Sequence, residues 1–596
     1  MKPVSLSLLF LATLLAAACS STPTPDAADS ELQPAKTAAG EVAPTGWRGR
    51  KYAVATAHPL ASEAGQQMLH AGGSAVDAAI AAQMVLTLVE PQSSGIGGGA
   101  FLLHDDGRRT LAYDGRETAP AAASEKLFLK PDGQPITFHE AIIGGRAVGV
   151  PGTLRMLEMA HAEYGRLPWG SLFGPAIALA EGGFPVSRRL HEQLRSDPHL
   201  ARDPSAAAYF YGADGEPRAI GSILRNPELA AVLRRIASEG ARALHEGDIA
   251  QAIVDKVQTH ANPGRLSLAD LAAYQAKKRT PLCHRYSPKE VDPPRTYRIC
   301  GFPPPSSGGI AIAQILGILE QTGAASLKAE DPLWLHYYTE AARLAFADRA
   351  QYVADPDFVA APADGWQSLI NPDYLFARAQ LIGEQSMRVA PPGQPRGAML
   401  SYAPMPEQFE QGTSHLSIVD AYGNALAMTT TIEDAFGARQ MVRGFLLNNE
   451  LSDFSFAPTD ANGVPIANRV QPGKRPRSSM SPTLVFDDDS GDLVLSGGSP
   501  GGALIIHYTA KLLYATLNWG FPLQQAIDLP NFGSLNGPTL LEEKRFPPST
   551  SEALQARGHE VKEIGMVSGL QAIRRHRAGV LSGGADLRRE GRVAGE

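Results

Sequence analysis

The chain has 596 residues, of which 44% are hydrophobic and 19% charged, and its formal net charge is -7. This is ordinary globular composition, and the length suits several domains or one large composite core. The negative charge, without any basic stretch, argues against a nucleic-acid-binding protein.

The first residues have the pattern of an export signal. Lys2 precedes an apolar run over 6–15, and three alanines follow before Cys19. The run is too short to span a bilayer as a helix of the mature protein, so we predict a signal peptide over 1–18. Cys19 then resembles the lipidated cysteine of a bacterial lipoprotein, which predicts a periplasmic, membrane-anchored protein. Ordinary cleavage after the alanines, releasing the protein into the periplasm, is the alternative.

A low-complexity segment separates this signal from the predicted fold. Residues 19–45 are rich in Ser, Thr, Pro and Ala, a composition typical of a flexible tether. The remaining two cysteines, Cys283 and Cys300, flank a short Pro-rich segment. In an oxidising compartment they predict one disulfide without a catalytic role, and two separate buried thiols are the alternative.

The first part of the fold is predicted to be mainly helical. An Ala-rich helical stretch over 61–89 is broken by glycines, and Ser74 is placed to cap its second half. The glycines of 95–99 formally match a dinucleotide-binding pattern. However, a helix precedes them and a strand-like segment, 101–104, follows, which is the reverse of a nucleotide-binding turn. We predict a close-packed turn instead.

An arginine follows the next predicted strand. Arg116 has the side chain best shaped to hold a carboxylate by two parallel bonds, although an arginine in such a turn is more often a solvated surface charge. Further along the chain, apolar periodicity predicts helices near 153–164, 172–182, 227–238, 246–259, 310–320 and 334–352, and a strand over 297–300.

The segment before residue 412 differs from these elements. Residues 388–411 are rich in Pro, Gly and Gln, which predicts an exposed, mobile connection. It ends at Gly412-Thr413, directly before an alternating strand pattern over 414–420. A second strand, 424–431, is predicted to complete a hairpin at Tyr422-Gly423. Strands at 483–486, 493–496 and 572–581, with helices after Gly501 and Ser551, are predicted to follow.

Thr413 is a candidate nucleophile. A threonine hydroxyl needs a base, and its own α-amino group, with a reference pKa of about 8, can serve once the preceding bond is cut. Gly412 suits this chemistry because a residue without Cβ can enter strained geometry. Taken alone, Gly-Thr before a strand is more often a loop that enters a strand.

Ser499 is the rival nucleophile. Gly497-Gly498-Ser499-Pro500-Gly501 matches the nucleophile elbow of α/β-hydrolases, with Asp528 and His559 downstream in the right order. Pro500 argues against it, because the residue after the serine must donate a backbone N–H and proline has none. Gly501 and Gly502 do have N–H groups at a predicted helix start, where they suit an oxyanion hole for a nucleophile from elsewhere.

Together these residues resemble the gamma-glutamyltransferase (gamma-glutamyl transpeptidase) family of N-terminal-nucleophile hydrolases. The resemblance covers nearly the whole chain after the tether. Its most specific motifs are Thr413-Ser414-His415, Leu447-Asn448-Asn449-Glu450, Lys474-Arg475-Pro476, Ser478-Ser479-Met480-Ser481-Pro482 and Gly498-Ser499-Pro500-Gly501-Gly502.

The resemblance implies an α/β (α+β) fold, a four-layer αββα sandwich built from two subunits of one precursor. Cleavage between Gly412 and Thr413 would give a large subunit, 46–412, and a small subunit, 413–596. Thr413 would be the nucleophile of both self-cleavage and turnover, with Thr431 as a supporting hydroxyl. Gly501 and Gly502 would stabilise the oxyanion.

The resemblance also implies a pocket for a γ-glutamyl group. Its α-carboxylate needs donors, which Arg116, Ser478 and Ser479 can supply, and its α-ammonium needs acceptors, which are expected from Glu433, Glu450 and Asp453. The expected reaction takes a γ-glutamyl amide such as glutathione and passes the acyl group to water or an acceptor amine. No metal or organic cofactor is expected, because no ligand spacing such as H-E-x-x-H occurs.

Three departures from the family pattern are visible. Ser414 replaces a common second threonine, Glu433 stands where some members have asparagine, and Arg477 replaces a frequent apolar residue. The segment 456–471, which matches a lid loop, is shorter than in long-lid members and has no Tyr or Trp, so a partly open site is expected. Alternatives are a glutaryl-type (cephalosporin) acylase of the same family, a Ser499 α/β-hydrolase and an inactive binding protein.

Overall fold

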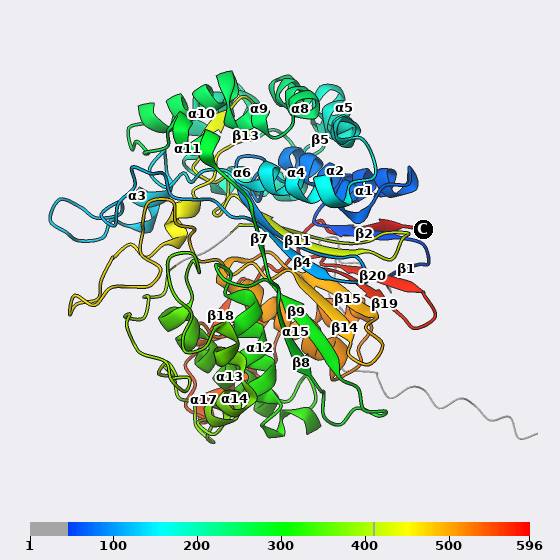
Figure 1. Cartoon of the computed structure of the whole chain (residues 1–596), viewed down its shortest axis with the longest axis vertical. Coiled ribbons are helices and arrows are strands. Elements are labelled where there is room, and N and C mark those ends of the chain that lie inside the picture. The colour runs from blue at the N-terminus through cyan, green and yellow to red at the C-terminus, as the bar shows by residue number, and fades with distance from the viewer. Residues whose placement is uncertain (1–45, 409–411) are drawn as a thin grey trace, which may run out of the picture. The chain divides into compact units, whose positions relative to one another are not determined.

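Two seven-stranded sheets lie face to face, and helices cover the outer face of each (Figure 1). This is a computed structural model, which describes residues 46–408 and 412–596. The predicted signal peptide, the tether and Cys19 lie outside the described residues. The four layers confirm the αββα architecture.

The first sheet contains the strand that begins after Thr413. Its strands run antiparallel in the order β21 (Arg592–Gly595), β2 (Ala53–Thr56), β10 (Ser414–Val419), β11 (Ala425–Thr431), β3 (Gly99–Asp105), β4 (Thr110–Gly115) and β7 (Lys277–Arg279). The second sheet has the order β1 (Trp47–Gly49), β20 (Leu581–Ala585), β19 (Gln571–Arg575), β15 (Leu493–Gly498), β14 (Thr483–Asp487), β9 (Tyr297–Gly301) and β8 (Leu282–Tyr286).

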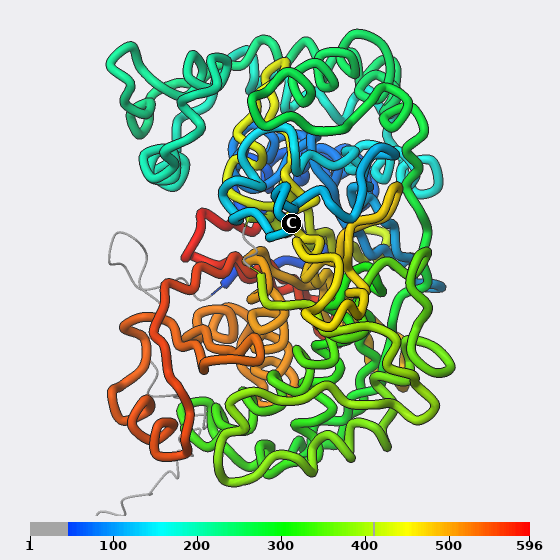
Figure 2. The backbone as a smooth tube through the Cα atoms, turned by 90° about the vertical axis from the view of Figure 1, so that its left-hand side faces the viewer, coloured from blue at the N-terminus to red at the C-terminus, as the bar shows by residue number. Residues whose placement is uncertain are grey.

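Each sheet combines strands from before and after residue 412. In the first sheet, β10 and β11 lie between β2 and β3 and pair with both. Figure 2 shows the same mixing, with orange and red parts of the chain beside blue and green ones. The two parts of the chain therefore share one core and are not separate domains.

Strand alternation explains the layers. Leu416 and Ile418 of β10 pack with the helices on the outer face, whereas Val419 packs with Ala427 between the sheets. Successive side chains of a strand point to opposite faces, and here both faces are buried. The apolar alternation after Thr413 therefore places β10 in the centre of the sandwich.

The helices form the two outer layers. On the first sheet lie α1 (Pro59–His70), α2 (Ala75–Val89) and α4 (Thr153–Tyr164), and beyond these helices lie α5 (Gly174–Gly182), α8 (Pro227–Glu239) and α10 (Gly247–Thr259). On the second sheet lie α12 (Gly308–Leu319) and α15 (Ile505–Leu517), and α13 (Pro332–Tyr352) packs on α12. The shorter elements are α3 (Phe138–Ile142), α6 (Arg188–Ser196), α7 (Pro204–Phe210), α9 (Arg242–His245), α11 (Leu268–Ala273), α14 (Pro372–Ala379), α16 (Leu523–Asp528), α17 (Pro548–Ala556), β5 (Phe184–Pro185), β6 (Ile223–Leu224), β12 (Met441–Val442), β13 (Phe445–Leu446), β16 (Phe532–Gly533), β17 (Thr539–Glu542) and β18 (Val561–Ile564).

Helix α2 begins at the predicted cap, Ser74, and its first turn contacts the turn that follows β10. Ser74 and Asp77 form a reciprocal capping box at its start, which confirms the predicted cap. The carboxylate of Asp420, in the turn after β10, accepts a hydrogen bond of 2.9 Å from the backbone N–H of Ala75. The turn of the predicted hairpin is thereby tied to the helix that packs beneath it.

The glycines of 95–99 form the expected close-packed turn. A Cβ on Gly97 would lie 2.2 Å from the carbonyl oxygen of Leu446, and one on Gly98 would lie 2.0 Å from that of Thr431. Only glycine fits such backbone approaches. The turn thus packs against the end of β11 next to Thr413, and it is not a nucleotide-binding loop.

Two sequence predictions were wrong. The predicted strand 572–581 is two strands, β19 and β20, because the chain reverses at Gly579, where φ is +74°. The connection before Gly412 is also not wholly exposed. Ala390, Ala403 and Met405 are buried, and the N–H of Met405 donates to the carbonyl of Ala350 at 2.9 Å.

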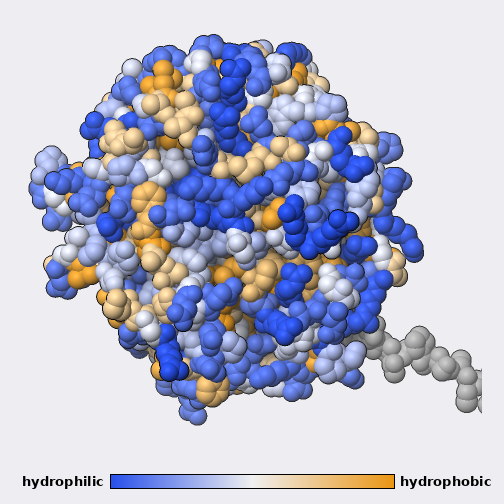
Figure 3. Space-filling view, in the orientation of Figure 1, coloured by the Kyte–Doolittle hydropathy of each residue, from blue (hydrophilic) through white to orange (hydrophobic). Residues whose placement is uncertain are grey.

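The surface is mostly polar. On the face drawn in Figure 3, hydrophobic residues form small scattered groups among hydrophilic ones. Within residues 46–408 and 412–596, none of the helices combines the length and apolar character needed to cross a bilayer.

Cys283 and Cys300 are joined by a disulfide, as predicted. They are directly opposed on β8 and β9, with their Cα atoms 4.0 Å apart. The bond joins the two strands of the hairpin at the edge of the second sheet, and the two cysteines are 17 residues apart in the sequence.

Replacing both cysteines by serine is expected to lower the free energy of unfolding by about 3 kcal/mol, because the closed loop restricts the unfolded chain. Denaturant unfolding of the double variant and of the wild type, with and without reductant, measures the change. Wild-type protein that is equally stable in reductant would contradict a stabilising role for the bond.

Candidate active site

Thr413 is held at the start of the central strand β10. Its side chain is buried, with the residue 4% exposed. Its N–H donates to the carbonyl of Ser93 at 3.1 Å, and its own carbonyl accepts from Nη1 of Arg589 at 2.8 Å. Next to it, the hydroxyl of Ser414 donates to the buried carboxylate of Glu90. The backbone on both sides of the Thr413 side chain is therefore fixed.

The bond before Thr413 has an unusual conformation. Gly412 has a φ of +99° and Thr413 a φ of +91°. The second value is strained, since a β-branched residue rarely adopts a positive φ. A Cβ on Gly412 would lie 1.5 Å from the carbonyl oxygen of Glu433, so only glycine fits here.

The hydroxyl of Thr413 points toward a second threonine. Its Oγ1 donates to Oγ1 of Thr431 at 3.3 Å, and Thr431 Oγ1 also accepts from the N–H of Glu433 at 2.7 Å. The pairing of β10 with β11 sets Ser414 opposite Thr430, which brings the preceding and following threonines together. The predicted supporting hydroxyl of Thr431 is therefore beside the hydroxyl of Thr413.

A small pocket gathers most of the predicted residues. Its volume is about 20 Å³, room for roughly one water molecule. It contains every residue predicted to bind substrate, and its lining is Arg116, Thr413, Thr431, Glu433, Glu450, Asp453, Ser478, Ser479, Met480, Gly502 and Ile505. We call it the acyl pocket.

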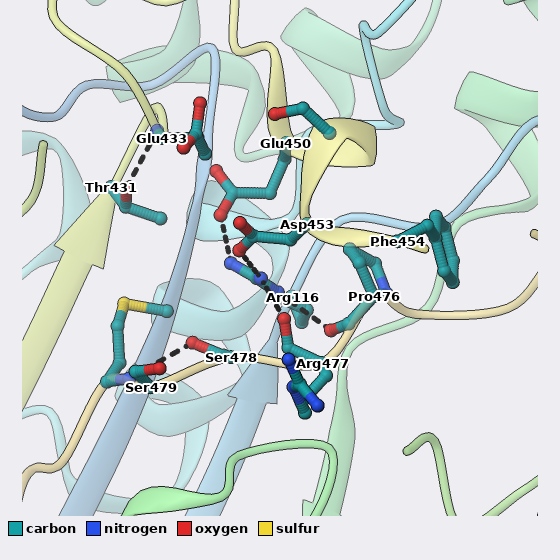
Figure 4. Close-up of polar contacts among 12 residues, drawn as sticks. Arg116, Thr431, Glu433, Glu450, Asp453, Phe454, Pro476, Arg477, Ser478 and Ser479 are labelled. Atoms are coloured by element: carbon teal, nitrogen blue, oxygen red, sulfur yellow. Dashed lines mark hydrogen bonds and ion pairs between the residues drawn. The ribbon is translucent and has the colours of Figure 1, made fainter. Parts of the chain in front are cut away.

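Arg116 is the centre of the acyl pocket (Figure 4). Its two terminal nitrogens form ion pairs with Glu450 and Asp453, and its Nε donates to the carbonyl of Pro476 at 3.1 Å. Glu450 and Asp453 lie in one short turn, 334 and 337 positions from Arg116 in the sequence. The predicted carboxylate-binding cation and two of the predicted ammonium-binding anions thus contact one another.

The charges of the pocket are unbalanced toward the negative. Burial, aided by the charges of Asp453, Asp434 and Glu450, raises the pKa of Glu433 well above its ordinary value. Burial opposes the charge on Arg116, but the neighbouring Glu450 and Asp453 outweigh it and hold the pKa of Arg116 above its usual range. A buried cation is therefore surrounded by more carboxyl groups than it can neutralise, which favours a ligand with an ammonium group.

One of the two serines of the pocket, Ser479, is positioned by a residue that sequence analysis did not assign. Arg349 donates from Nη2 to Ser479 Oγ at 2.6 Å and from Nε to Ser307 Oγ at 2.9 Å. The Ser478 hydroxyl oxygen accepts a hydrogen bond from the N–H of Met480 at 3.1 Å. Arg349 therefore fixes the position of the Ser479 hydroxyl by donating to its oxygen.

The predicted oxyanion donors lie beside Thr413. Gly502 lines the acyl pocket, and Gly501 lines a larger cavity together with Gly412. Neither glycine N–H donates a hydrogen bond to any residue that the structure describes. Gly501 has a φ of +134°, and a Cβ there would lie 2.5 Å from the ring of Tyr508. Glycine is thus required for the turn that presents these N–H groups.

The Ser499 alternative was wrong. The strand and helix around it are present, but Ser499 is fully buried, and its hydroxyl donates to the carbonyl of Pro500 at 2.8 Å. His559 pairs with His336 at 2.8 Å, and Asp528 accepts from Gln524 at 3.0 Å, so neither contacts Ser499 or the other. The triad that the elbow needs does not assemble.

Comparison with known proteins agrees with this geometry. The family model described as Gamma-glutamyltranspeptidase matches residues 61–596.

The chain belongs to the gamma-glutamyltranspeptidase family.

The relatives in this family include proteins named glutathione hydrolase and proteins named acylase. The chain is 37% identical over 564 residues to a glutathione hydrolase proenzyme of Bacillus subtilis (strain 168), covering 92% of each chain. It is 35% identical over 559 residues to the acylase ACY 1 proenzyme of Pseudomonas sp. (strain V22), covering 92% of this chain and 93% of the relative. A solved cephalosporin acylase from Bacillus halodurans has a TM-score of 0.78 at 26% identity, covering 98% of this chain and 99% of that one.

The structure places two features that depart from the gamma-glutamyltranspeptidase pattern, Arg477 and the segment 456–471. The Arg477 side chain turns away from Arg116 in Figure 4 and lines a neighbouring cavity of about 510 Å³. The lid-like segment 456–471 contributes no residue to the acyl pocket. Its residues 459–465 fold back on themselves, and Ile466 pairs with Ala403. The lid-like segment is therefore not part of the wall of the acyl pocket, and the partly open site stays a prediction.

Thr431→Val is expected to slow the chemistry of Thr413 by about tenfold to a hundredfold, because it removes one buried hydrogen-bond partner of the hydroxyl. The fraction of chain cut before residue 413, followed over time, measures the effect. Thr430→Val is the matched control, since the adjacent buried Thr430 Oγ1 has no hydrogen-bond partner among the described residues. Equal rates for the two variants would contradict the role of Thr431.

Glu433→Gln is expected to raise the thermal midpoint relative to wild type by about 2 °C more at pH 8 than at pH 5. A carboxyl whose folded pKa is raised contributes stability below its unfolded pKa and loses it as the pH rises through the folded value. The amide cannot ionise, so the variant escapes that loss.

Two controls accompany this measurement. Glu320→Gln should show a change of the same sign, because burial raises the pKa of Glu320 to about 7. Glu125→Gln, at an exposed position, should show the same difference from wild type at both pH values. A midpoint difference for Glu433→Gln that does not vary with pH would refute an ionisable, destabilising Glu433.

Proposed function

We propose that the protein is an exported gamma-glutamyltransferase and glutathione hydrolase, matured by cleavage before Thr413. The observation that carries this proposal is the acyl pocket, which combines a threonine hydroxyl, an oxyanion turn and charged groups of both signs. Family membership and the relatives named glutathione hydrolase support it.

Maturation is proposed to begin with attack of Thr413 Oγ1 on the carbonyl carbon of Gly412. The C–N bond breaks, the hydroxyl proton passes to the leaving nitrogen, and an ester forms between Gly412 and Thr413. Water then hydrolyses the ester and leaves a carboxylate on Gly412 and a free amine on Thr413. The positive φ of Thr413 supports this step, since cutting the bond releases the backbone strain.

In turnover, the free amine of Thr413 serves as the base. It takes the hydroxyl proton as Oγ1 attacks the γ-carbonyl of the donor, and it gives that proton to the leaving amine. The N–H groups of Gly501 and Gly502 stabilise the oxyanion. Water or an acceptor amine then attacks the γ-glutamyl ester and gives a proton, through the Thr413 amine, to the departing Oγ1. Ser93, whose carbonyl accepts from the Thr413 nitrogen, fixes the direction of the amine.

Donor recognition is proposed to exchange one ion pair for another. Arg116 contacts Glu450 and Asp453, and the pocket has room for about one water molecule. A glutamyl α-carboxylate must therefore separate Arg116 from at least one of these carboxylates, which then faces the α-ammonium. Glu433, Ser478 and Ser479 complete the contacts. The internal ion pairs keep the buried charges compensated when no donor is bound.

An acylase that removes glutaryl groups is the second candidate, because a cephalosporin acylase shares the fold across the chain. A glutaryl group lacks the α-ammonium. Three carboxyl side chains, Glu433, Glu450 and Asp453, would then line the pocket without a ligand cation, which is unfavourable in a buried site. The acidic lining therefore favours the γ-glutamyl donor.

The mature protein is proposed to consist of a large subunit, 46–412 with what remains of the tether, and a small subunit, 413–596. The interleaved strands of both sheets would hold the two together without a covalent link. We propose export through the signal at 1–18 and membrane anchoring through a lipidated Cys19. The proposed chemistry uses no metal or organic cofactor.

Wild-type protein is expected to run as two fragments on a denaturing gel and to release the aniline from a γ-glutamyl anilide. Thr413→Ala should remain one chain and lose activity by about 10⁴-fold or more. Ser499→Ala is the control and should keep both cleavage and activity.

Glutaryl anilide in the same assay distinguishes the acylase. A wild-type chain that stays uncut yet active would refute the Thr413 mechanism, and faster release from glutaryl than from γ-glutamyl anilide would favour the acylase. The intact mass of the large fragment tests whether Cys19 carries acyl groups.

A further inference from the structure

Arg589 is a buried arginine that is bound to the nucleophile and lacks an opposite charge. The residue is 8% exposed, and its Nη1 donates to the carbonyl of Thr413 at 2.8 Å. Its Nε has no hydrogen-bond partner, and it forms no ion pair with any carboxylate that the structure describes. Burying a cation without an opposite charge is costly, so a function is expected for this one.

Close packing holds the Arg589 side chain in place. A Cβ on Gly569 would lie 2.7 Å from Cδ of Arg589 and 3.0 Å from its Nε, so a larger residue at position 569 would displace the arginine. The backbone N–H of Arg589 donates to the carbonyl of Asp586 at 3.3 Å. The guanidinium group therefore has a fixed position next to Thr413.

This position is close to the atom that becomes the amine of the cut chain. The nitrogen and the carbonyl oxygen of one residue are less than about 4 Å apart. Because Nη1 of Arg589 is bound to the carbonyl oxygen of Thr413, it lies within about 7 Å of the Thr413 nitrogen. Two positive charges at this distance in a buried site disfavour each other, so Arg589 favours the uncharged amine.

Most other charged side chains near Thr413 have an oppositely charged partner. The pairs are Glu90 with Arg189, Arg116 with Glu450 and Asp453, Asp434 with Arg439, and Asp586 with Arg588. Burial raises the pKa of the carboxyl groups of Glu433 and Glu590, which favours their neutral forms, and Glu407 is exposed to solvent. The charge of Arg589 is therefore not balanced by these neighbours.

We propose that Arg589 keeps the amine of Thr413 uncharged in the cut chain, so that this amine can act as the base. An ordinary α-amine, with a pKa of about 8, is mostly protonated at pH 7 and cannot accept the hydroxyl proton. The inference rests on the proposed function and adds a positioning residue, which acts on the amine through the charge of its side chain.

Glu90 is expected to act in the opposite sense. Its carboxylate accepts from the hydroxyl of Ser414, the residue next to the nucleophile, and Nε of Arg189 donates to it at 3.4 Å. A negative charge at this place favours the protonated amine. The two buried side chains thus allow two changes of opposite sign at one amine.

The test is the pH dependence of kcat/KM for a γ-glutamyl anilide, whose fall at acidic pH reports the base of the free enzyme. In Arg589→Gln the midpoint of this fall should rise by about one pH unit, because a nearby positive charge is removed. Arg589→Lys should keep the wild-type midpoint, because the charge remains. The midpoint does not depend on the amount of active enzyme, so partly cut protein suffices.

Three further variants separate charge from structure. Glu90→Gln should lower the midpoint, since it removes a negative charge while the amide can still accept from Ser414. Arg592→Gln is the matched control, because that arginine is 57% exposed and pairs with Glu63, and it should keep the wild-type midpoint. Glu433→Gln should also keep it, which shows that the acidic fall does not report Glu433.

Each other outcome overturns a specific claim. A wild type that releases no aniline overturns the proposed function, and this inference with it. In an active enzyme, an unchanged midpoint in Arg589→Gln, or an equal rise in Arg589→Lys, overturns the role of the Arg589 charge alone. So does an acidic fall that disappears in Glu433→Gln.

Failure of self-cleavage also has a defined meaning. If neither Arg589 variant is cut, Arg589 serves maturation and the proposal is overturned. If only Arg589→Gln stays uncut, Glu90→Gln decides, and an unchanged midpoint in that variant overturns the proposal.

Discussion

The pairing of β10 with β11 determines how Thr413 lies against Thr431. Ser414 is opposite Thr430 in this register, so Thr413 meets Thr431 across the end of the pair. A slip by one residue would turn every side chain of β10 to the other face. Because both faces of the strand are buried, such a slip would exchange the side chains that face the helices with those that face the second sheet. The packing of these layers thereby fixes the position of Thr413.

The same packing concentrates strain at one peptide bond. The carbonyl of Glu433 lies where a Cβ on Gly412 would be, and Thr413 is held at a positive φ between contacts to Ser93 and Arg589. A chain end of low stability could not maintain such a conformation, because it would relax. Placing the bond at the entry to a central strand gives it a rigid support on one side. The buried residues Ala403 and Met405 show that the preceding segment is also partly anchored.

Charge distribution differs between the acyl pocket and the cavity next to it. In the acyl pocket, the carboxyl groups of Glu433, Glu450 and Asp453 surround a single arginine, Arg116. The neighbouring cavity of about 670 Å³ has two arginines, Arg189 and Arg589, together with uncharged polar and apolar side chains. Gly502 lines the acyl pocket and Gly501 lines the neighbouring cavity, so the turn that they form lies where the two spaces meet.

The sequence alone determined the features that depend on local pattern. The cap at Ser74, the close turn of 95–99 and the alternation after Thr413 were all predicted correctly, because each depends on neighbouring residues and on backbone geometry. Family motifs then named the residues of the acyl pocket. Local pattern failed at 572–581, where a turn at Gly579 interrupts residues that otherwise suit one strand. It also failed at the connection before Gly412, because distant parts of the chain bury some of its apolar residues.

Only the tertiary structure decided what these residues do to one another. It showed that Arg116 pairs with Glu450 and Asp453, more than 300 positions away, and that His559 pairs with His336 while the Ser499 hydroxyl donates to the carbonyl of Pro500. It also brought Arg189 and Arg589 to one cavity and oriented Ser479 through Arg349. None of these contacts follows from spacing along the chain, because each joins segments that meet only when the two sheets stack and bury their shared face.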